Sequence, residues 1–174
     1  MTTENTYKDK TVATFIHIST FSKYFFPFGN FILPLILWTA KRNDPFVDEN
    51  GKQAINFQIS TFLYFILLCA IAICGFAYWG LQMHWEDSMK ITRNFIHFGN
   101  VTGTVSLFIF AGIIGTLVLG LFILEIVCVI TAAMRANEGQ VYKYPISINF
   151  ITPTPVGKNQ SKNEQFNNTQ NETL

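Results

Sequence analysis

Charged residues are scarce in this chain of 174 residues, of which only 13% are Asp, Glu, Lys or Arg. An ordinary soluble domain carries about 25%. The scarcity is concentrated, because no charged residue occurs from Gln53 to Trp85 or from Asn94 to Leu124. Each stretch exceeds the roughly 20 residues with which a helix crosses about 30 Å of hydrocarbon. The two stretches therefore predict two membrane-spanning helices.

Cysteine and clustered positive charge are also scarce, and each absence excludes a class of protein. The three cysteines, Cys69, Cys74 and Cys128, lie in apolar sequence and have neither metal-ligand spacing nor the even count of a disulfide framework. We interpret them as small packing residues. The net charge is only +1, and nucleic-acid binding needs Lys and Arg clustered on one face. The sequence therefore indicates no nucleic-acid partner.

Catalytic motifs are missing too. The chain contains no Gly-rich phosphate loop, no H-E-x-x-H sequence and no nucleophile elbow. Asp48 and Glu49 are neighbouring carboxylates, but neither a nucleophile nor a histidine accompanies them. We expect them to lie in a turn with local pairing to Arg42 or Lys52. The sequence thus predicts no enzyme, no catalytic or metal-binding residues, and no cofactor.

What is present is a succession of apolar segments. A polar segment, 1–10, precedes an apolar one, 11–26, and a second apolar run covers 28–40. Proline fixes φ and glycine permits positive φ, so the residues between and within these runs predict a turn or hairpin motif of Pro27, Gly29, Asn30 and Pro34. Each run is short. They form either a hairpin of two short spans or a re-entrant pair, which is tolerated where protein or water covers the irregular backbone.

The rest of the membrane domain, which we expect to cover 11–151, consists of two longer spans, 54–81 and 104–134. The tail, 152–174, is rich in Asn, Gln, Thr and Lys and should be disordered because it can bury little apolar area. Small residues follow one another at i, i+4 and i+8 on the last span, where a helix can approach closely; these are Gly112, Thr116 and Gly120. The ridge serves either packing within the chain or self-association.

The fold class predicted is an all-α integral membrane protein with four transmembrane helices, the first two a short hairpin broken by proline and glycine. Lys and Arg near the span ends then divide seven to three between the two sides, counting Lys8, Lys10, Lys41, Arg42, Lys52, Arg135 and Lys143 against Lys23, Lys90 and Arg93. Because cytoplasmic loops carry the excess, both termini should be cytoplasmic.

Three polar residues lie within the predicted spans and are candidates for a buried polar layer. Glu125 lies ten positions before Arg135, or roughly 15 Å deep, and His17 and Gln58 lie about 9–11 Å deep at about 1.5 Å per residue. The three could meet in one layer, with Glu125 as the partner of His17. Such a layer either staples helices together by hydrogen bonds or forms a proton- or solute-sensitive site, since ionisable groups inside membranes are functional candidates.

The motifs also resemble those of a family of small bacterial membrane proteins that carries a domain-of-unknown-function label. The resemblance runs from about Val12 to Ile151 and rests on His17-Ile18-Ser19, Phe26 to Asn30 with Pro34 and Trp38, Pro45 to Asp48, Asn56 to Gln58, and Ala136 to Pro145. That family is related in its four-helix plan to the Tic-type import component of the chloroplast inner envelope. The resemblance implies a multi-pass protein of the bacterial cytoplasmic (inner) membrane, with no activity to carry over.

Two functions compete at this point. The first is a non-enzymatic scaffold or subunit that acts through helix–helix association, with the lipid bilayer and itself or other membrane proteins as partners. The second is an oligomeric transporter or channel, including one related to protein translocation, because broken helices at membrane depth often line solute paths. Stable hetero-complexes would favour the scaffold, and a conducting homo-oligomer would favour the channel.

Overall fold

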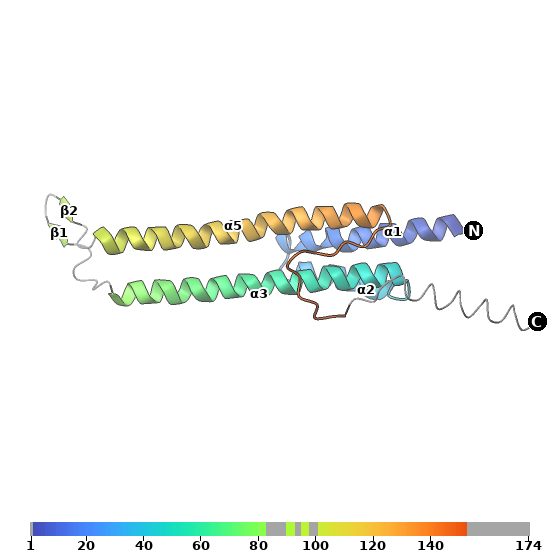
Figure 1. The fold of residues 1–174 in the computed structure, drawn as a ribbon, viewed down its shortest axis with the longest axis horizontal. Helices are drawn as coiled ribbons and strands as arrows, with labels where there is room; N and C mark the ends of the chain where they lie inside the picture. The colour runs from blue at the N-terminus through green and yellow to red at the C-terminus, as the bar shows by residue number, and fades with distance from the viewer. Residues whose placement is uncertain (1, 83–89, 93–94, 98–100, 153–174) are drawn as a thin grey trace, which may run out of the picture. The chain divides into compact units, whose positions relative to one another are not determined.

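The structure is a computed structural model that describes residues 2–82, 90–92, 95–97 and 101–152, and side chains over 10–81 and 103–152. Its described residues form four α-helices, a short 3-10 helix and a two-stranded hairpin (Figure 1). The elements are α1 (Thr2–Ser19), η1 (Thr20–Tyr24), α2 (Gly29–Ala40), α3 (Pro45–Gln82), β1 (Lys90–Thr92), β2 (Phe95–His97) and α5 (Val101–Asn137). In the antiparallel hairpin, Ile91 pairs with Ile96. The predicted disordered tail, from residue 153 on, lies outside the described residues.

The chain divides into two compact units, and α3 and α5 contribute to both. We call Met1–Thr61 together with Glu125–Leu174 the polar-core unit, and Phe62–Leu124 the apolar unit. The polar-core unit contains α1, η1, α2, the first part of α3 and the last part of α5. The apolar unit contains the remainder of the two long helices and the strands between them.

Two helices are long and apolar enough to cross a membrane, Pro45–Leu81 and Gly103–Asn137. This agrees with the two spans predicted from the charge-free stretches. The helix Gly29–Ala40 is apolar but shorter, about 18 Å at 1.5 Å per residue. Four helices are therefore present in the described residues, and two of them have both the length and the apolar composition of a transmembrane span.

Helix α3 begins at Pro45, nine residues before the predicted start of its span. Asp44 caps it, because one carboxylate oxygen of Asp44 accepts hydrogen bonds from the backbone N–H groups of Phe46 and Val47 at 2.7 and 3.2 Å. Proline is favoured at the position that follows such a cap. Asn50-Gly51, which resembles a turn signal, lies inside the helix instead. Gly51 is needed there because a Cβ would overlap the ring of Trp38.

The turn between η1 and α2 follows the predicted hairpin motif. Phe28 has φ 59° and precedes α2. A Cβ on Gly29 would lie 2.7 Å from the backbone of Ser22, so glycine permits the close approach that the turn requires. Pro34 lies inside α2 and is buried. The motif thus forms a tight hairpin between two short helical arms, α1–η1 and α2.

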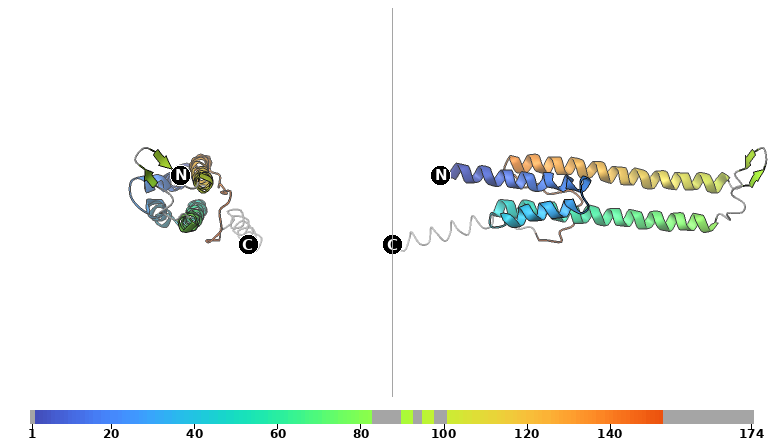
Figure 2. Two further views of the ribbon diagram at one scale, coloured as in Figure 1. Left: turned by 90° about the vertical axis from the view of Figure 1, so that its left-hand side faces the viewer. Right: turned by 180° about the vertical axis from the view of Figure 1, so that it is seen from behind.

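The polar-core unit is polar inside and apolar outside. Its core contains an apolar cluster around Ile16, Trp38 and Val47, but eleven of its buried side chains are polar or charged. These are His17, Thr20, Ser22, Glu49, Asn50, Gln53, Asn56, Gln58, Ser60, Thr61 and Glu125. Large apolar side chains lie on its surface, among them Phe15, Ile18, Phe25, Phe28, Ile32, Leu35, Ile36, Val127, Ile130, Met134, Ile148 and Phe150. After α5, residues 138–152 run alongside α3 without forming a strand, as both views in Figure 2 show.

The apolar unit is held together by aromatic packing. A Cβ on Gly75 of α3 would overlap the ring of Phe110 of α5. The Phe110 ring packs against Phe76 and Trp79, at centroid separations of 5.8 and 5.0 Å. The indole N–H of Trp79 also donates to the hydroxyl of Ser106 at 3.2 Å. Because Gly75 has no side chain, the Phe110 ring of α5 can pack directly against the backbone of α3.

Candidate functional site

His17 is the centre of a buried hydrogen-bond chain that joins α1, α3 and the segment after α5. Its Nε2 lies 3.0 Å from the amide oxygen of Asn50, and its Nδ1 lies 2.9 Å from the hydroxyl of Tyr144. The amide nitrogen of Asn50 donates to the carbonyl oxygen of Phe46 at 2.9 Å. The amide oxygen of Asn50 must therefore accept from Nε2–H, and Nδ1 of His17 accepts from the hydroxyl of Tyr144. This assigns a neutral imidazole with its proton on Nε2.

Tyr144 is fixed by its ring as well as by its hydroxyl. The ring stacks on Phe57 of α3, with centroids 4.1 Å apart and planes inclined by 14°. Burial raises the pKa of Tyr144 well above its ordinary value. The phenol consequently keeps its proton, which the hydrogen bond to His17 requires. Residues 127 apart in the sequence thus form one packed unit.

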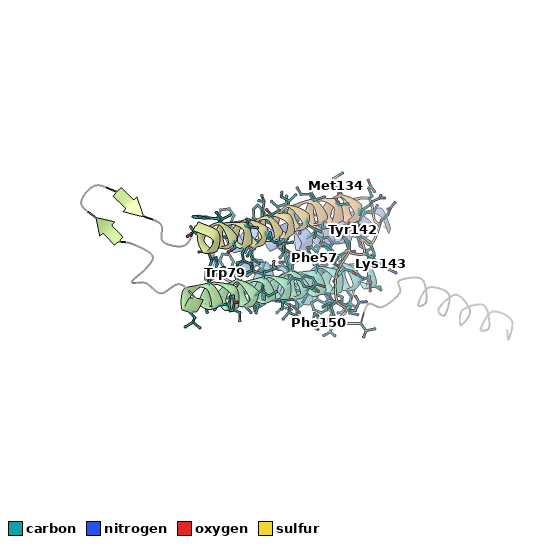
Figure 3. The ribbon with its side chains drawn as sticks, turned by 60° about the vertical axis from the view of Figure 1, so that its left-hand side comes forward. Phe57, Trp79, Met134, Tyr142, Lys143 and Phe150 are labelled. Atoms are coloured by element: carbon teal, nitrogen blue, oxygen red, sulfur yellow. The ribbon has the colours of Figure 1, made fainter. Side chains whose placement is uncertain are left out.

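The segment after Tyr144 is held on α3 by side chains rather than by a strand partner. The amide of Asn56 accepts from the backbone N–H of Ile151 at 2.8 Å and donates to its carbonyl at 2.7 Å. The hydroxyl of Ser60 accepts from the backbone N–H of Ile148 at 2.8 Å. These bonds satisfy backbone groups that could not remain unpaired away from water. Figure 3 labels Tyr142, Lys143 and Phe150 of this part of the chain together with Phe57 of α3.

The α1–α2 turn is tied to the long helices by two polar pairs. Lys23 of η1 forms an ion pair with Glu125 of α5 at 2.5 Å, and the Lys23 ammonium lies 5.2 Å from the centre of the Tyr24 ring. On the other side of the turn, the amide nitrogen of Asn30 donates to the amide oxygen of Gln58 at 2.9 Å. The amide nitrogen of Gln58 is buried and has no protein partner in the described residues. The tip of the hairpin is therefore fixed at the level of Gln58 on α3 and Glu125 on α5.

All three residues of the predicted polar layer are buried, but they do not pair with one another as expected. His17 hydrogen-bonds to Asn50 and Tyr144, Gln58 to Asn30, and Glu125 to Lys23. The predicted His17–Glu125 pair is thus wrong. It fails because the hairpin places Lys23, and not His17, beside Glu125, while Asn50 and Tyr144 take up both ring nitrogens of His17.

The predicted polar layer omits several buried polar residues of α3, although their spacing in the sequence is a recognisable pattern. Polar residues on α3 recur at i, i+4, i+7 and i+11, which is the period of one helix face; they are Glu49, Gln53, Asn56 and Ser60. All four are buried. This stripe indicates a helix whose polar face points inward.

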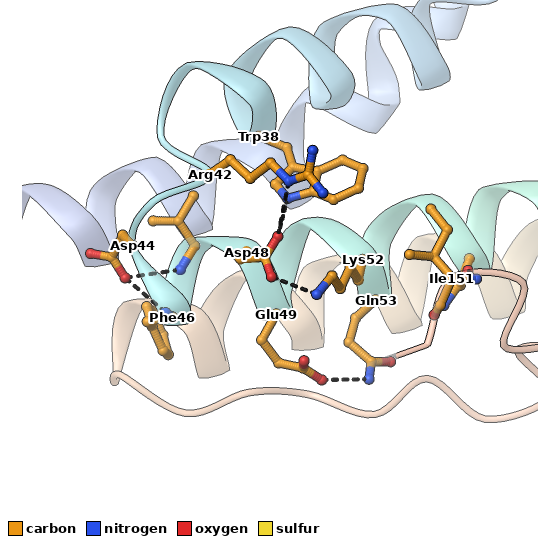
Figure 4. A network of polar contacts seen from close by, with 11 residues as sticks. Trp38, Arg42, Asp44, Phe46, Asp48, Glu49, Lys52, Gln53 and Ile151 are labelled. Carbon is orange, nitrogen blue, oxygen red and sulfur yellow. Dashed lines mark hydrogen bonds and ion pairs between the residues drawn. The ribbon is translucent and has the colours of Figure 1, made fainter. Parts of the chain in front are cut away.

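Asp48 lies on α3 rather than in a turn, and its predicted local pairing is confirmed. It accepts from the indole N–H of Trp38 at 2.9 Å and pairs with Lys52 at 2.5 Å (Figure 4). The guanidinium of Arg42 lies 5.8 Å from the Trp38 ring and 4.0 Å from the Asp48 carboxylate. Glu49 points to another neighbour, since its carboxylate accepts from the amide of Gln53 at 3.1 Å. Asp48 therefore joins α2 to α3, and both carboxylates stabilise the first turns of α3.

The predicted small-residue ridge lies on an exposed face of α5 in the apolar unit. A Cβ at Gly112, Gly115 or Gly120 would meet no atom within 4 Å. Thr116 is exposed, and its hydroxyl donates to the carbonyl oxygen of Gly112 in its own helix at 2.8 Å. Of the two uses left open for the ridge, packing within the chain is therefore not observed among the residues that the structure describes. The face remains open to another helix or to lipid.

The site is suited to holding segments together, and a metal centre does not form among the residues with described positions. There, no group of three or more His, Cys, Asp or Glu side chains comes together. Nearly all the buried polar atoms hydrogen-bond to protein groups, apart from the Gln58 amide nitrogen and the Ser147 hydroxyl.

Comparison with known proteins places the chain in a family. No curated protein and no solved structure matches it. Residues 8–151, however, match the family described as the magnetosome magnetite crystal formation protein family. The match supports a small bacterial membrane protein, as the resemblance implied, and does not support a relation to the Tic-type import component. The chain is therefore a member of the magnetosome magnetite crystal formation protein family.

Proposed function

We propose that this chain is a non-enzymatic membrane scaffold or subunit that acts in magnetite crystal formation through helix–helix association. The family match supplies the process. The polar-core unit supports a structural role, because its buried hydrogen bonds join α1, α2, α3, α5 and the segment after α5. We also propose that both termini lie on the cytoplasmic side of the magnetosome membrane, where the excess of Lys and Arg would place them.

The observation that carries the proposal is the open face of α5. Gly112, Gly115 and Gly120 present backbone to their surroundings, with large apolar side chains such as Phe108 and Ile113 exposed nearby. In lipid there is no hydrophobic force between helices, so they associate where small residues let backbones approach closely. Gly75 shows what such a contact looks like when it is occupied, since a ring of the facing helix fills the space that a Cβ would take. The α5 face has the same opening without an occupant among the described residues.

The test replaces the open glycines with a bulky residue and measures association. We expect Gly112→Leu/Gly120→Leu to weaken crosslinking and to shift the purified protein to a smaller species in mild detergent, because leucine keeps the backbones apart. Gly80→Leu is the matched control, since a Cβ at Gly80 on α3 also meets no atom within 4 Å. In cells, crystal size measured by electron microscopy should change with the double variant and not with the control. Normal association and normal crystals in the double variant would refute the scaffold.

A further inference from the structure

The polar-core unit exposes many large apolar side chains and buries many polar ones, unlike a protein that is surrounded by water. Soluble proteins bury apolar groups and expose charged ones, whereas this unit buries His17, Asn50 and Glu125 and exposes Phe15, Ile36 and other large apolar side chains. In lipid, polar groups must find partners inside the protein. The hydrogen bonds of the core meet that requirement for the buried side-chain N and O atoms of the described residues, apart from the Gln58 amide nitrogen and the Ser147 hydroxyl. The polarity of the unit therefore matches a hydrocarbon environment.

Exposed charges of this unit gather at one end. Lys41 and Arg42 follow α2, Arg135 is in the last turn of α5, and Glu138 and Lys143 follow that helix. Figure 1 shows the α2–α3 connection and the C-terminal end of α5 at the same end of the unit. Lys10 of α1 belongs to this end too, because its Cε lies 2.8 Å from the position that a Cβ would take on Gly139. This charged end is where water and lipid head groups would contact the unit.

The other end of the hairpin is apolar and aromatic. Phe25 and Phe28, on either side of Phe26-Pro27, are 88% and 63% exposed, and Tyr24 is exposed as well. Between the two arms, an apolar groove of ≈ 350 Å³ is lined by Val12, Phe15, Ile18, Ser19, Leu33, Ile36 and Leu37. The groove is almost wholly apolar, and the most exposed side chains of the tip, Phe25 and Phe28, are apolar too.

The reach of the hairpin is about half of a bilayer. The 12 residues of α2 rise about 18 Å at 1.5 Å per residue. The tip is fixed by the Lys23–Glu125 pair, and Glu125 lies ten positions, or about 15 Å, from Arg135 at the charged end. The hydrocarbon core is about 30 Å thick. A hairpin of this length that starts at the charged end stops near the middle of the membrane.

We propose that α1–η1–α2 is a re-entrant hairpin, which enters the bilayer from the charged end, ends with its aromatic tip among the acyl chains, and returns to the same side. Lipid acyl chains fill the groove between its arms. Lys23 tolerates this depth because Glu125 neutralises it and the Tyr24 ring lies beside it. The chain then has two full spans, on α3 and α5, instead of four. This inference does not rest on the proposed scaffold function.

The test is a single-cysteine scan of the full-length protein in membrane vesicles of known orientation. Cys69, Cys74 and Cys128 are first replaced by alanine. Phe25→Cys is then compared with Asn43→Cys in the α2–α3 connection and with Lys90→Cys in β1, using a membrane-impermeant maleimide. We expect Asn43→Cys and Lys90→Cys to react from opposite sides. Phe25→Cys should react about tenfold less than either of them, from both sides, because hydrocarbon excludes the reagent.

Two results would overturn the proposal by labelling alone. Reaction of Phe25→Cys from the side of Lys90→Cys would show that the hairpin crosses the membrane, as in a four-span fold. Reaction from the side of Asn43→Cys would show that the tip lies in water.

A nitroxide attached to Phe25→Cys in detergent, before reconstitution, separates lipid from protein burial. The re-entrant hairpin predicts frequent collisions with oxygen and few with a water-soluble nickel chelate, whereas few collisions with both would mean that protein covers the tip and would overturn the proposal. Wild-type-like thermal stability of the variant in detergent shows that the label reports on the folded protein.

Discussion

The two units share the helices α3 and α5 but bury different chemistry. In the polar-core unit, α3 contributes Asn50, Asn56 and Gln58, each of which hydrogen-bonds to another segment. In the apolar unit, the same helix contributes Gly75 and Trp79, which fit against Phe110. The first unit is specified by donor and acceptor pairing, and the second by the shape of a close contact.

The difference shows two ways of stabilising a helical protein where hydrophobic burial contributes little. Lipid tails are as apolar as leucine, so packing and hydrogen bonds must hold the helices together. Hydrogen-bonded cores are sensitive to the loss of a single partner, because the remaining group stays buried and unpaired. Close-packed contacts are instead sensitive to added volume. Substitutions that remove a hydrogen-bonding partner and substitutions that add volume should therefore destabilise the two units to different extents. The expected losses of stability are largest for the ion pair of Lys23 and smallest for the hydrogen bond of Ser106.

The largest effect is expected at the ion pair beneath the hairpin tip. Lys23→Met leaves the buried carboxylate of Glu125 without its cation, and breaking a buried pair costs about 3–5 kcal/mol. The free energy of unfolding should fall by that amount, as measured by denaturant titration in detergent micelles. Lys23→Met/Glu125→Gln is the control, since it removes both charges, and most of the loss should be recovered. A loss as large in the double variant would show that the pair is not the cause.

A smaller effect is expected in the apolar unit from adding one methyl group. Gly75→Ala places a Cβ against the Phe110 ring, which Phe76 and Trp79 hold in place. Overpacking of this kind costs about 1–3 kcal/mol. Gly80→Ala meets open space and should be neutral or stabilising by up to about 1 kcal/mol, because alanine favours the helix. Equal stabilities of the two variants in the same titration would contradict the close contact.

The sequence predicted the apolar unit better than the polar-core unit, for a physical reason. A charge-free stretch such as Asn94 to Leu124 reports directly on a lipid environment. The contacts within the stretch, such as Gly75 with Phe110, depend on how two helices face each other, and periodicity does not determine that. The existence of the spans was therefore predictable, and their packing was not.

In the polar-core unit, burial was predictable and pairing was not. His17, Gln58 and Glu125 were recognised as polar residues in apolar surroundings, and all three are buried. Their partners were missed because Tyr144 lies 127 positions from His17 and belongs to a segment without regular secondary structure. The early start of α3 could have been predicted from Asp44-Pro45, a cap followed by proline.

An effect no larger than that of Gly75→Ala, within the same range of about 1–3 kcal/mol for a buried acceptor left unpaired, is expected from removing the hydroxyl of Tyr144. Tyr144→Phe keeps the ring stacked on Phe57 but removes the donor to Nδ1 of His17. Hydrogen exchange of residues 144–151 should also accelerate, since the segment loses one of its attachments. Tyr142→Phe, on the neighbouring ring 5.2 Å away, is the control: its side chain hydrogen-bonds to Cys128 and not to His17, so it should cost less than Tyr144→Phe and leave the hydrogen bond to His17 in place. If both variants behave alike, the hydrogen bond to His17 does not hold the segment.

The smallest effect is expected where a hydrogen bond only supplements aromatic packing. Ser106→Ala removes the acceptor of the Trp79 indole N–H, and such bonds between membrane helices are worth about 0.6 kcal/mol on average. The control is Thr116→Ala, whose hydroxyl bonds only to a carbonyl of its own helix in the described contacts, so the contact between helices should stay unchanged. A loss at Ser106 as large as that from Lys23→Met would mean that hydrogen bonds specify the apolar unit too, and the contrast between the two units would fail. If Ser106→Ala lowers the stability by about the expected amount and Gly75→Ala lowers it by more, the packing of the apolar unit is specified by the shape of the contact between Gly75 and Phe110.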